Sequence, residues 1–366
     1  MSLAPYVAAG FAALDKLAEP PAPISVPTLA CMAGVSQFIG LTAQGLRCLA
    51  RGGKSSGQGD PRVLRTPEGY FEGLDAFPFA PHYFEHDGCR LHYLDEGPND
   101  ASEVVLLIHG MPTWSYLYRK VIPPLVAEGY RVLALDFCGM GKSDKPVDST
   151  KYSFASHVAS ISALVTHLRI NHPCVTLVIH DWGGVIGQAA LPTLAKVQSR
   201  LVVLNTLGVG PSCMGLKGML CFFIWQGACR VIGRALPIAD LCAGGAGGPN
   251  LVSAKAAAGY GAPFPSTDYK ALAAIWPLAY NDLYRVWKQY YDALCWAQDN
   301  LTAPILVAFA NEDVIVDGAR ADNFYKSWMK RSKAVESVAI PNASHFLQEA
   351  NPSAVSTAII TFIKKH

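Results

Sequence analysis

The sequence predicts an α/β protein in which a mostly parallel central sheet has helices on both faces and carries one helical insertion. Three observations support this prediction. From about residue 65 onward, short runs of consecutive apolar residues alternate with helical patterns. Apolar runs without polar alternation are typical of strands that are buried on both faces of a parallel sheet. The stretch 207–301 contains helical patterns but no such run, so it interrupts the alternation.

The predicted strands begin with a hairpin. Residues 83–85 and 90–94 flank the pair Asp87-Gly88, which is typical of a hairpin turn. The continuous apolar runs that follow are 104–108, 131–135, 175–179, 201–204, 305–309 and 335–340. The helix predicted at 154–168 places five apolar side chains on one face, namely Val158, Ile161, Leu164, Val165 and Leu168.

The helical stretch is interpreted as a cap over the sheet. Helical patterns such as 278–296 fill residues 207–301. We expect this insertion to lie over the carboxyl ends of the strands, where open α/β sheets bind ligands. The predicted organisation is therefore a core of residues 65–206 and 302–366, a cap of residues 207–301, and an N-terminal extension of residues 1–64.

The extension differs from the rest of the chain. Its uncharged stretch 23–46 is interrupted by Pro, Gly and Gln, which makes a stable membrane span a poor interpretation. No basic residue precedes Lys16, so the basic start of a secretory signal is missing. A targeting segment, a helix lying on a membrane surface and a disordered extension all stay open.

The composition limits the classes of molecule that this protein is expected to bind. The 366 residues are 51% hydrophobic, and 30 basic against 28 acidic residues leave a net charge of +2. This balance lacks the basic stripe that nucleic acid requires, which favours a small apolar molecule as the substrate. The ten cysteines lie mostly among apolar residues without a CxxC pair, as expected for reduced thiols in an intracellular compartment, either the cytoplasm or an organelle. The oligomeric state stays open.

Asp181 is the predicted nucleophile. It follows the buried run 175–179 and precedes Trp182-Gly183-Gly184 at the start of a helical pattern. A tight turn from strand to helix needs a small residue at Gly183, so the pattern is that of a nucleophile elbow with Asp in place of Ser. A carboxylate there attacks carbon directly and forms an ester. The alternative is that Asp181 only caps the helix.

Two further residues complete a predicted triad. Asp313 follows the run 305–309, and His345 follows the run 335–340. The order Asp181, Asp313, His345 is the nucleophile, acid and base order of the α/β-hydrolase fold. After an earlier strand, His109-Gly110-Met111-Pro112 lies where the backbone N–H of Met111 can form an oxyanion hole together with that of Trp182.

From residue 65 to the C-terminus the chain resembles a haloalkane dehalogenase, of the branch whose triad acid follows the seventh strand. The matching motifs are His92-Tyr93-Leu94-Asp95-Glu96-Gly97, His109-Gly110-Met111-Pro112-Thr113-Trp114-Ser115-Tyr116-Leu117-Tyr118-Arg119, the stretch from Asp136 to Pro146, Asp181-Trp182-Gly183-Gly184, and Ala262-Pro263-Phe264-Pro265. The resemblance implies a hydrolase that converts a haloalkane to an alcohol and a halide ion through an Asp-alkyl ester, without an organic cofactor or a metal.

The resemblance also implies a halide site. It assigns halide-binding indole N–H groups to Trp182 and Trp225, although Trp225 could instead belong to the packed core of the cap. Trp276, Trp287 and Trp296 are interpreted as helix-packing residues. One departure concerns Met111, because the related branch has Glu at this position and another branch has an Asn that helps to hold the halide.

Two other functions stay open on the same scaffold. An epoxide hydrolase shares the Asp elbow and the His base but uses cap tyrosines as acids, and possible donors are Tyr260, Tyr269, Tyr280, Tyr284, Tyr290 and Tyr291. A coelenterazine-type monooxygenase or a non-catalytic binding protein is the second alternative, because a fold does not determine its function. Met111 is the residue that keeps this second alternative open.

Overall fold

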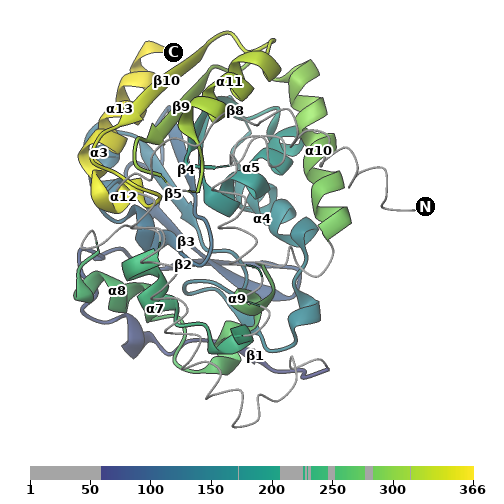
Figure 1. Ribbon diagram of the computed structural model, residues 1–366, viewed down its shortest axis with the longest axis vertical. Coiled ribbons are helices and arrows are strands. Elements are labelled where there is room, and N and C mark those ends of the chain that lie inside the picture. The colour runs from purple at the N-terminus through teal and green to yellow at the C-terminus, as the bar shows by residue number, and fades with distance from the viewer. Residues whose placement is uncertain are drawn as a thin grey trace, which may run out of the picture.

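An eight-stranded sheet forms the centre of the protein (Figure 1). The computed structural model describes residues 59–366 except 172, 207–225, 227–228, 230–231, 246–251, 277–282 and 314. The strands of the sheet are β2 (His82–His86), β3 (Cys89–Glu96), β4 (Val104–Ile108), β5 (Arg131–Leu135), β7 (Val175–His180), β8 (Gln198–Leu204), β9 (Ile305–Ala310) and β10 (Val335–Ile340). Their order across the sheet is β10-β9-β8-β7-β4-β5-β3-β2.

Most neighbouring strands in this sheet are parallel. All pairs from β10 to β5 run in the same direction, whereas β2 and β3 pair in antiparallel fashion. Every residue of β4, β7 and β9 is buried, which explains why these strands are continuous apolar runs in the sequence. At the edge, β10 exposes residues 337–339 to solvent. The predicted α/β architecture with a mostly parallel sheet is confirmed.

The predicted hairpin is present between β2 and β3. Asp87 and Gly88 have φ angles of 51° and 73°, and His86 pairs with Cys89 across the turn. Two central residues with positive φ match the right-handed twist of the flanking strands. A separate two-stranded antiparallel sheet joins β1 (Val63–Leu64) to β6 (Lys145–Pro146).

Helices cover both faces of the sheet. They are α3 (Ile122–Ala127), α4 (Phe154–His167), α5 (Asp181–Leu194), α10 (Leu283–Asn300), α11 (Gly318–Trp328) and α13 (Pro352–Lys365). Helices α4 and α10 both pack on α5 at one face, and α3 packs on α13 at the other (Figure 1). Helix α4 corresponds to the helix predicted at 154–168, and the side chain of Ser153 caps its first turn by accepting a bond from the N–H of Ser156.

Short helical turns complete the structure. Outside the insertion they are η2 (Glu68–Phe71), η3 (Ser115–Tyr118), η4 (Ser149–Lys151) and α12 (Leu347–Ala350). Between β8 and β9 they are η6 (Gly233–Ala235), α7 (Ile238–Asp240), η7 (Leu241–Gly245), α8 (Ala254–Gly261), η8 (Thr267–Lys270) and α9 (Ala271–Ile275). The described residues between β8 and β9 contain no strand, as the sequence predicts.

This helical segment contacts the loops at the carboxyl ends of the strands. The indole N–H of Trp114, after β4, donates to the carbonyl of Gly259 in α8 over 3.1 Å. The hydroxyl of Tyr260, also in α8, donates to Glu349, which follows β10. Helix α10 lies along α5 at the flank of the sheet instead (Figure 1). The boundaries of a cap domain at residues 207 and 301 stay a prediction.

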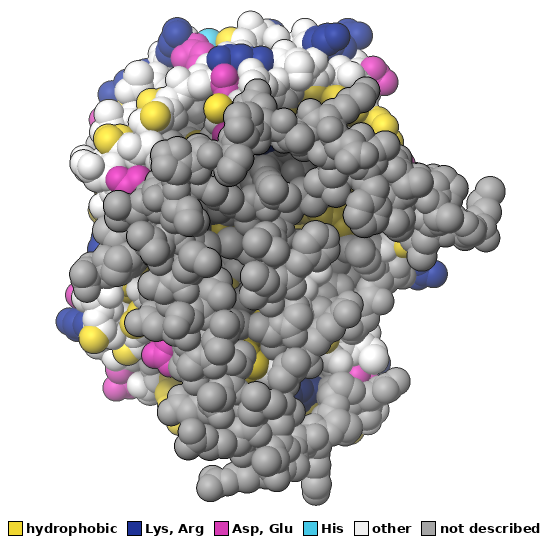
Figure 2. Space-filling model, viewed as in Figure 1, with side chains coloured by type: hydrophobic (Ala, Val, Ile, Leu, Met, Phe, Trp, Pro, Cys, Tyr) yellow, Lys and Arg dark blue, Asp and Glu magenta, His cyan; other side chains and the backbone are white. Residues whose placement is uncertain are grey.

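Residues 1–58 of the predicted extension, and Trp225 and Tyr280 of the predicted cap, lie outside the described ranges. Across those ranges, every helix is too short or too polar to cross a membrane. Where the face drawn in Figure 2 shows described side chains, basic and acidic groups both occur around its margin.

Candidate active site

Asp181 occupies the sharp turn between β7 and α5. Its φ angle is 51°, a left-handed conformation that a residue other than glycine adopts only when the surrounding structure holds it there. Its main-chain N–H donates to the carbonyl of Asn205 over 3.3 Å, and its carbonyl accepts a bond from the hydroxyl of Thr206 over 2.5 Å. A Cβ atom at Gly183 would lie 2.2 Å from the carbonyl oxygen of His109, so only glycine fits. The turn has the geometry of a nucleophile elbow.

The three predicted triad residues contact one another. Nε2 of His345 lies 3.3 Å from Oδ2 of Asp181, and Nδ1 of His345 lies 2.8 Å from Oδ2 of Asp313. The Asp313 side chain is fully buried, and its Oδ1 accepts bonds from the main-chain N–H groups of Ile315 and Val316. A carboxylate held in this way fixes the imidazole with Nδ1–H toward Asp313 and Nε2 toward Asp181.

The charges of these groups stabilise one another. Burial lowers the pKa of His345, but the negative charge of Asp313 and the hydrogen bond with Asp181 outweigh burial and raise this pKa to about 10. Burial raises the pKa of the Asp181 carboxyl, but the hydrogen bond and charge of His345 outweigh it and hold this pKa below its usual value. At neutral pH the resting site is therefore an ion pair between an Asp181 carboxylate and a His345 cation.

The loop after β4 holds the other oxygen of Asp181. The main-chain N–H of Met111 donates to Oδ1 of Asp181 over 2.9 Å. A Cβ atom at Gly110 would lie 2.4 Å from that oxygen, so glycine is required for the loop to approach so closely. A backbone hydrogen bond from Trp182 also lowers the pKa of Asp181. Two N–H groups directed at one carboxylate are the arrangement expected of an oxyanion hole.

A buried histidine supports this loop. The main-chain N–H of Phe137 donates to Nε2 of His109 over 3.2 Å, so Nε2 is the acceptor and Nδ1 carries the proton. Nδ1 then donates to the carbonyl of Gly110 over 2.7 Å. The hydroxyl of Thr113 donates to the same carbonyl. The peptide that presents Met111 to Asp181 is thus held from two sides.

Asn205, which the sequence analysis did not single out, joins the segments of the site. Its side-chain N–H group donates to the carbonyls of Ser344 and His345 over 3.0 and 3.2 Å, and its Oδ1 accepts a bond from the N–H of Ala310. His180 also donates to the carbonyl of His345, over 2.9 Å. The only signal for Asn205 in the sequence is its position directly after an apolar run, between the nucleophile and the acid.

Trp182 lies against a second buried tryptophan. Trp182 is 6% exposed, and its ring meets the ring of Trp276 edge-on, with 6.1 Å between centroids. Trp276, interpreted as a helix-packing residue, therefore lies beside the residue that follows the elbow. Trp225 lies outside the described residues, so its proposed contact with halide is not described.

Known proteins resemble this chain along most of its length. A family model described as alpha/beta hydrolase fold matches residues 103–215. The haloalkane dehalogenase of Mycobacterium marinum is 36% identical over 310 residues, which cover 82% of this chain and 99% of the relative. The haloalkane dehalogenase of Psychrobacter cryohalolentis is 34% identical over 312 residues, covering 82% of this chain and 98% of the relative.

A solved structure agrees with these sequence matches. The tetrameric haloalkane dehalogenase DpaA from Paraglaciecola agarilytica aligns with a TM-score of 0.70 and 30% identity, covering 82% of this chain and 99% of that chain. Identity and coverage of this size, together with the elbow and its histidine partner, establish the family. The chain belongs to the haloalkane dehalogenases of the α/β-hydrolase fold.

Proposed function

We propose that this protein hydrolyses haloalkanes to an alcohol and a halide ion through an ester on Asp181. The observation that carries the proposal is the Asp181 carboxylate at the elbow, within 3.3 Å of a histidine that is itself bonded to a buried carboxylate. Because Met111 holds Oδ1, we assign the attack to Oδ2. A bond forms between Oδ2 and the carbon that bears the halogen while the carbon–halogen bond breaks, and the halide leaves with the bonding electrons.

In the second half-reaction, water hydrolyses the ester. Nε2 of His345 removes a proton from the water as its oxygen attacks the carbonyl carbon of the ester. The negative charge that develops on Oδ1 is stabilised by the main-chain N–H groups of Met111 and Trp182. Collapse of the intermediate breaks the bond to the alkoxy oxygen, which takes the proton from Nε2 and leaves as the alcohol. The remaining proton of the former water passes to His345, which restores the Asp181 carboxylate and the His345 cation. Asp313 stabilises the His345 cation throughout this half-reaction.

The electrostatics of the site fit this order of events. The raised pKa of His345 depends partly on the charge and hydrogen bond of Asp181. Esterification removes that charge, so the pKa of His345 falls and the imidazolium releases its proton to solvent. The neutral imidazole can then accept a proton from water. Formation of the ester on Asp181 therefore activates His345 as the base that hydrolyses this ester.

The leaving halide requires donors in an apolar setting. An indole N–H is a donor without an acceptor, so Trp182, which is almost fully buried, suits a soft monoanion. Trp225 is proposed as the second donor, from the resemblance of its sequence context. Small apolar haloalkanes are the proposed substrates, and an intracellular compartment is the proposed location.

Four of the described cap tyrosines do not favour an epoxide hydrolase. Tyr260 is fully buried and donates its hydroxyl to Glu349, while the hydroxyl of Tyr290 accepts a bond from Gln188 in the core. Tyr284 and Tyr291 lie on the outer face of α10 and are 75% and 48% exposed. An acid that opens an epoxide must instead reach an oxygen held beside Asp181.

A trapping experiment tests the proposal. His345→Phe removes the base but leaves Asp181 able to attack, so the variant should release about one bromide per chain from bromobutane and then stop. The peptide that contains Asp181 should then carry the added mass of a butyl ester. The matched control is the double variant His345→Phe with Asp181→Ala, which should release no bromide and gain no mass.

Three other outcomes would contradict the proposal. Turnover of bromobutane by His345→Phe at the wild-type rate would exclude His345 as the base. A hydroxyalkyl ester formed from an epoxide, without bromide release from bromobutane, would indicate an epoxide hydrolase. A chain that traps neither reagent would support a binding protein or a different chemistry.

A further inference from the structure

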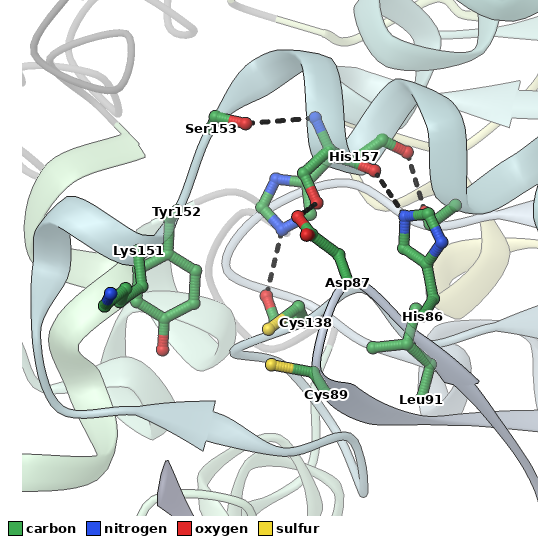
Figure 3. A pocket seen from close by; sticks show the side chains of 11 residues that line it. His86, Asp87, Cys89, Leu91, Cys138, Lys151, Tyr152, Ser153 and His157 are labelled. Atoms are coloured by element: carbon green, nitrogen blue, oxygen red, sulfur yellow. Dashed lines mark hydrogen bonds between the residues drawn. The ribbon is translucent and has the colours of Figure 1, made fainter. Parts of the chain in front are cut away.

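A second group of nucleophilic side chains lies in a narrow pocket away from the triad. The pocket is lined by the β2–β3 hairpin, the loop after β5 and the start of α4, and Figure 3 shows Cys89 and Cys138 side by side within it. The thiol of Cys138 donates to the carbonyl of Asp144 over 3.5 Å, and the two thiols lie close enough for each to shift the pKa of the other. Neither Asp181, Asp313 nor His345 lines this pocket.

Hydrogen bonds fix the backbone on both sides of the thiol pair. The N–H of Arg90, next to Cys89, donates to the carboxylate of Asp144, and the N–H of Asp144 donates back to the carbonyl of Arg90. The N–H of Gly139, next to Cys138, donates to the carbonyl of Asp144 over 2.8 Å. His157 bonds the carbonyl of Cys138 over 3.0 Å, as Figure 3 also shows. The two sulfurs therefore face each other on a framework that is already ordered, which raises their effective concentration.

The thiol of Cys89 differs chemically from other buried thiols of this chain. Burial raises the pKa of Cys174, Cys229 and Cys242, so these thiols stay protonated and inert. The neighbouring Cys138 thiol instead lowers the pKa of Cys89 and outweighs burial, while the pKa of Cys138 is raised. A thiolate is the nucleophile in disulfide exchange.

Access and the absence of further ligands point to the same chemistry. Both cysteines line the pocket, where Cys138 is partly exposed and Cys89 is buried. Among the described residues, no group of three His, Cys, Asp or Glu side chains is arranged to hold a metal ion. Two adjacent thiols without a third ligand are suited to oxidation to a disulfide.

We propose that Cys89 and Cys138 are a reversible disulfide site, oxidised by exchange with a low-molecular-weight disulfide such as oxidised glutathione. A thiolate of the pair attacks one sulfur of the external disulfide, forms a mixed disulfide and releases one glutathione thiol. The second cysteine loses its proton to solvent and attacks the sulfur of the first, which releases the second glutathione thiol. The two cysteines lose two electrons and two protons, and the external disulfide is reduced to two thiols.

The cross-link joins the hairpin to a loop that supports the active site. Phe137, the neighbour of Cys138, donates its N–H to His109, and His109 bonds the carbonyl of Gly110. A disulfide at Cys138 therefore restrains the loop on which Met111 depends. It also restricts the unfolded chain between Cys89 and Cys138, so the oxidised protein should melt roughly 5 °C higher than the reduced protein.

The test equilibrates the full chain with mixtures of reduced and oxidised glutathione, followed by alkylation of free thiols and peptide mass analysis. The expected result is a peptide pair joined through Cys89 and Cys138, which disappears on reduction, together with the rise in melting temperature. Cys138→Ser should stop at a mixed disulfide on Cys89 and lose the rise. Cys295→Ser, the matched control at another partly exposed cysteine, should retain both the cross-link and the rise.

Two results would overturn the proposal. The first is complete alkylation of both Cys89 and Cys138 after exposure to excess oxidised glutathione. The second is oxidation of the wild-type chain to mixed disulfides only, which would mean that the second exchange step does not occur. Because the readouts are mass and melting temperature, neither result depends on haloalkane turnover.

Discussion

Nδ1 of His345 lies 2.8 Å from Oδ2 of Asp313, in a contact from which solvent is excluded at the carboxylate. Asp317, four residues later, has a different role, since its side chain accepts bonds from the N–H groups of Ala319 and Arg320 and caps α11. Only one of these two acids is therefore placed to orient the imidazole. This contrast supports the choice of Asp313 made from the sequence.

Asn substitutions at these two positions should separate their roles. Asp313→Asn should lower kcat by about 10⁴-fold, because an amide cannot stabilise the imidazolium and favours the wrong tautomer. Asp317→Asn should leave kcat nearly unchanged, because Asn caps a helix almost as well as Asp. Bromide release under saturating substrate measures both variants. A large loss at Asp317 with little loss at Asp313 would reassign the acid.

The pKa of His345 predicts how stability changes with pH. A pKa raised from 6.5 to about 10 means that the folded chain keeps a proton that the unfolded chain loses. This contribution to stability is complete below pH 6.5 and is lost as the pH rises toward about 10. Urea unfolding from pH 6 to pH 10 should show the free energy of unfolding of the wild type falling relative to His345→Phe. Parallel curves for the two proteins across this range would contradict the prediction.

Substitutions at Met111 and Gly110 test whether Asp181 depends on the main-chain N–H of Met111 or on its side chain. Met111→Leu keeps the main-chain N–H and nearly the same volume, so the bromide burst should slow by less than about tenfold. Gly110→Ala should slow it far more, because its Cβ would lie 2.4 Å from Oδ1 of Asp181. Stopped-flow measurement of the burst compares the two neighbours. A severe loss in Met111→Leu would show that the thioether itself contributes to the reaction.

A buried ion pair connects the end of η3 to the segment that carries the base. Glu349, in α12 just after His345, accepts bonds from Arg119, from Lys120 and from the hydroxyl of Tyr260. Arg119 is fully buried, whereas the Lys120 side chain is 35% exposed. Loss of Arg119 therefore leaves a buried carboxylate without its main partner.

Two Met substitutions should measure this difference. Arg119→Met should lower the free energy of unfolding by about 3–5 kcal/mol, as expected when one partner of a buried pair is removed. Lys120→Met should lower it by about 1 kcal/mol or less, because solvent screens that contact. Urea unfolding at neutral pH checks both variants. Equal losses would mean that burial does not decide the strength of these two contacts.

Much of the fold and of the triad could be predicted from the sequence, for a physical reason. Strands buried on both faces must be apolar throughout, so β4, β7 and β9 can be recognised in the sequence as continuous apolar runs. A turn as tight as the one at Asp181 requires Gly183, so the elbow also leaves a pattern in the sequence. Residues at the ends of parallel strands meet at one edge of the sheet, which brings Asp313 and His345 to Asp181.

Other parts of the site leave no such pattern. Asn205 bonds main-chain atoms of Ala310, Ser344 and His345, and the main-chain N–H and carbonyl groups are the same whatever side chain a residue carries. The contact between Trp182 and Trp276 depends on how α9 approaches the elbow, which helical periodicity does not specify. Helix α10 has an apolar face that would fit a cap as well as the flank of α5.

The edge-on contact of Trp182 with Trp276 gives the halide site an optical signal. A bromide or iodide ion bound at the Trp182 indole should quench its fluorescence, and Trp276 lies within 6.1 Å to share the effect. Halide titration of the wild type should therefore lower the tryptophan emission in a saturable way. Trp182→Phe should remove most of this response, and Trp225→Phe should remove part of it if Trp225 supplies the second donor.

Trp296→Phe is the control, because Trp296 lines a different hollow beside Arg200 and should leave the saturable quenching unchanged. Emission that stays constant at high halide, or that falls only in proportion to halide concentration in every variant, would count against a halide site at Trp182 and would shift support to a substrate without a halogen.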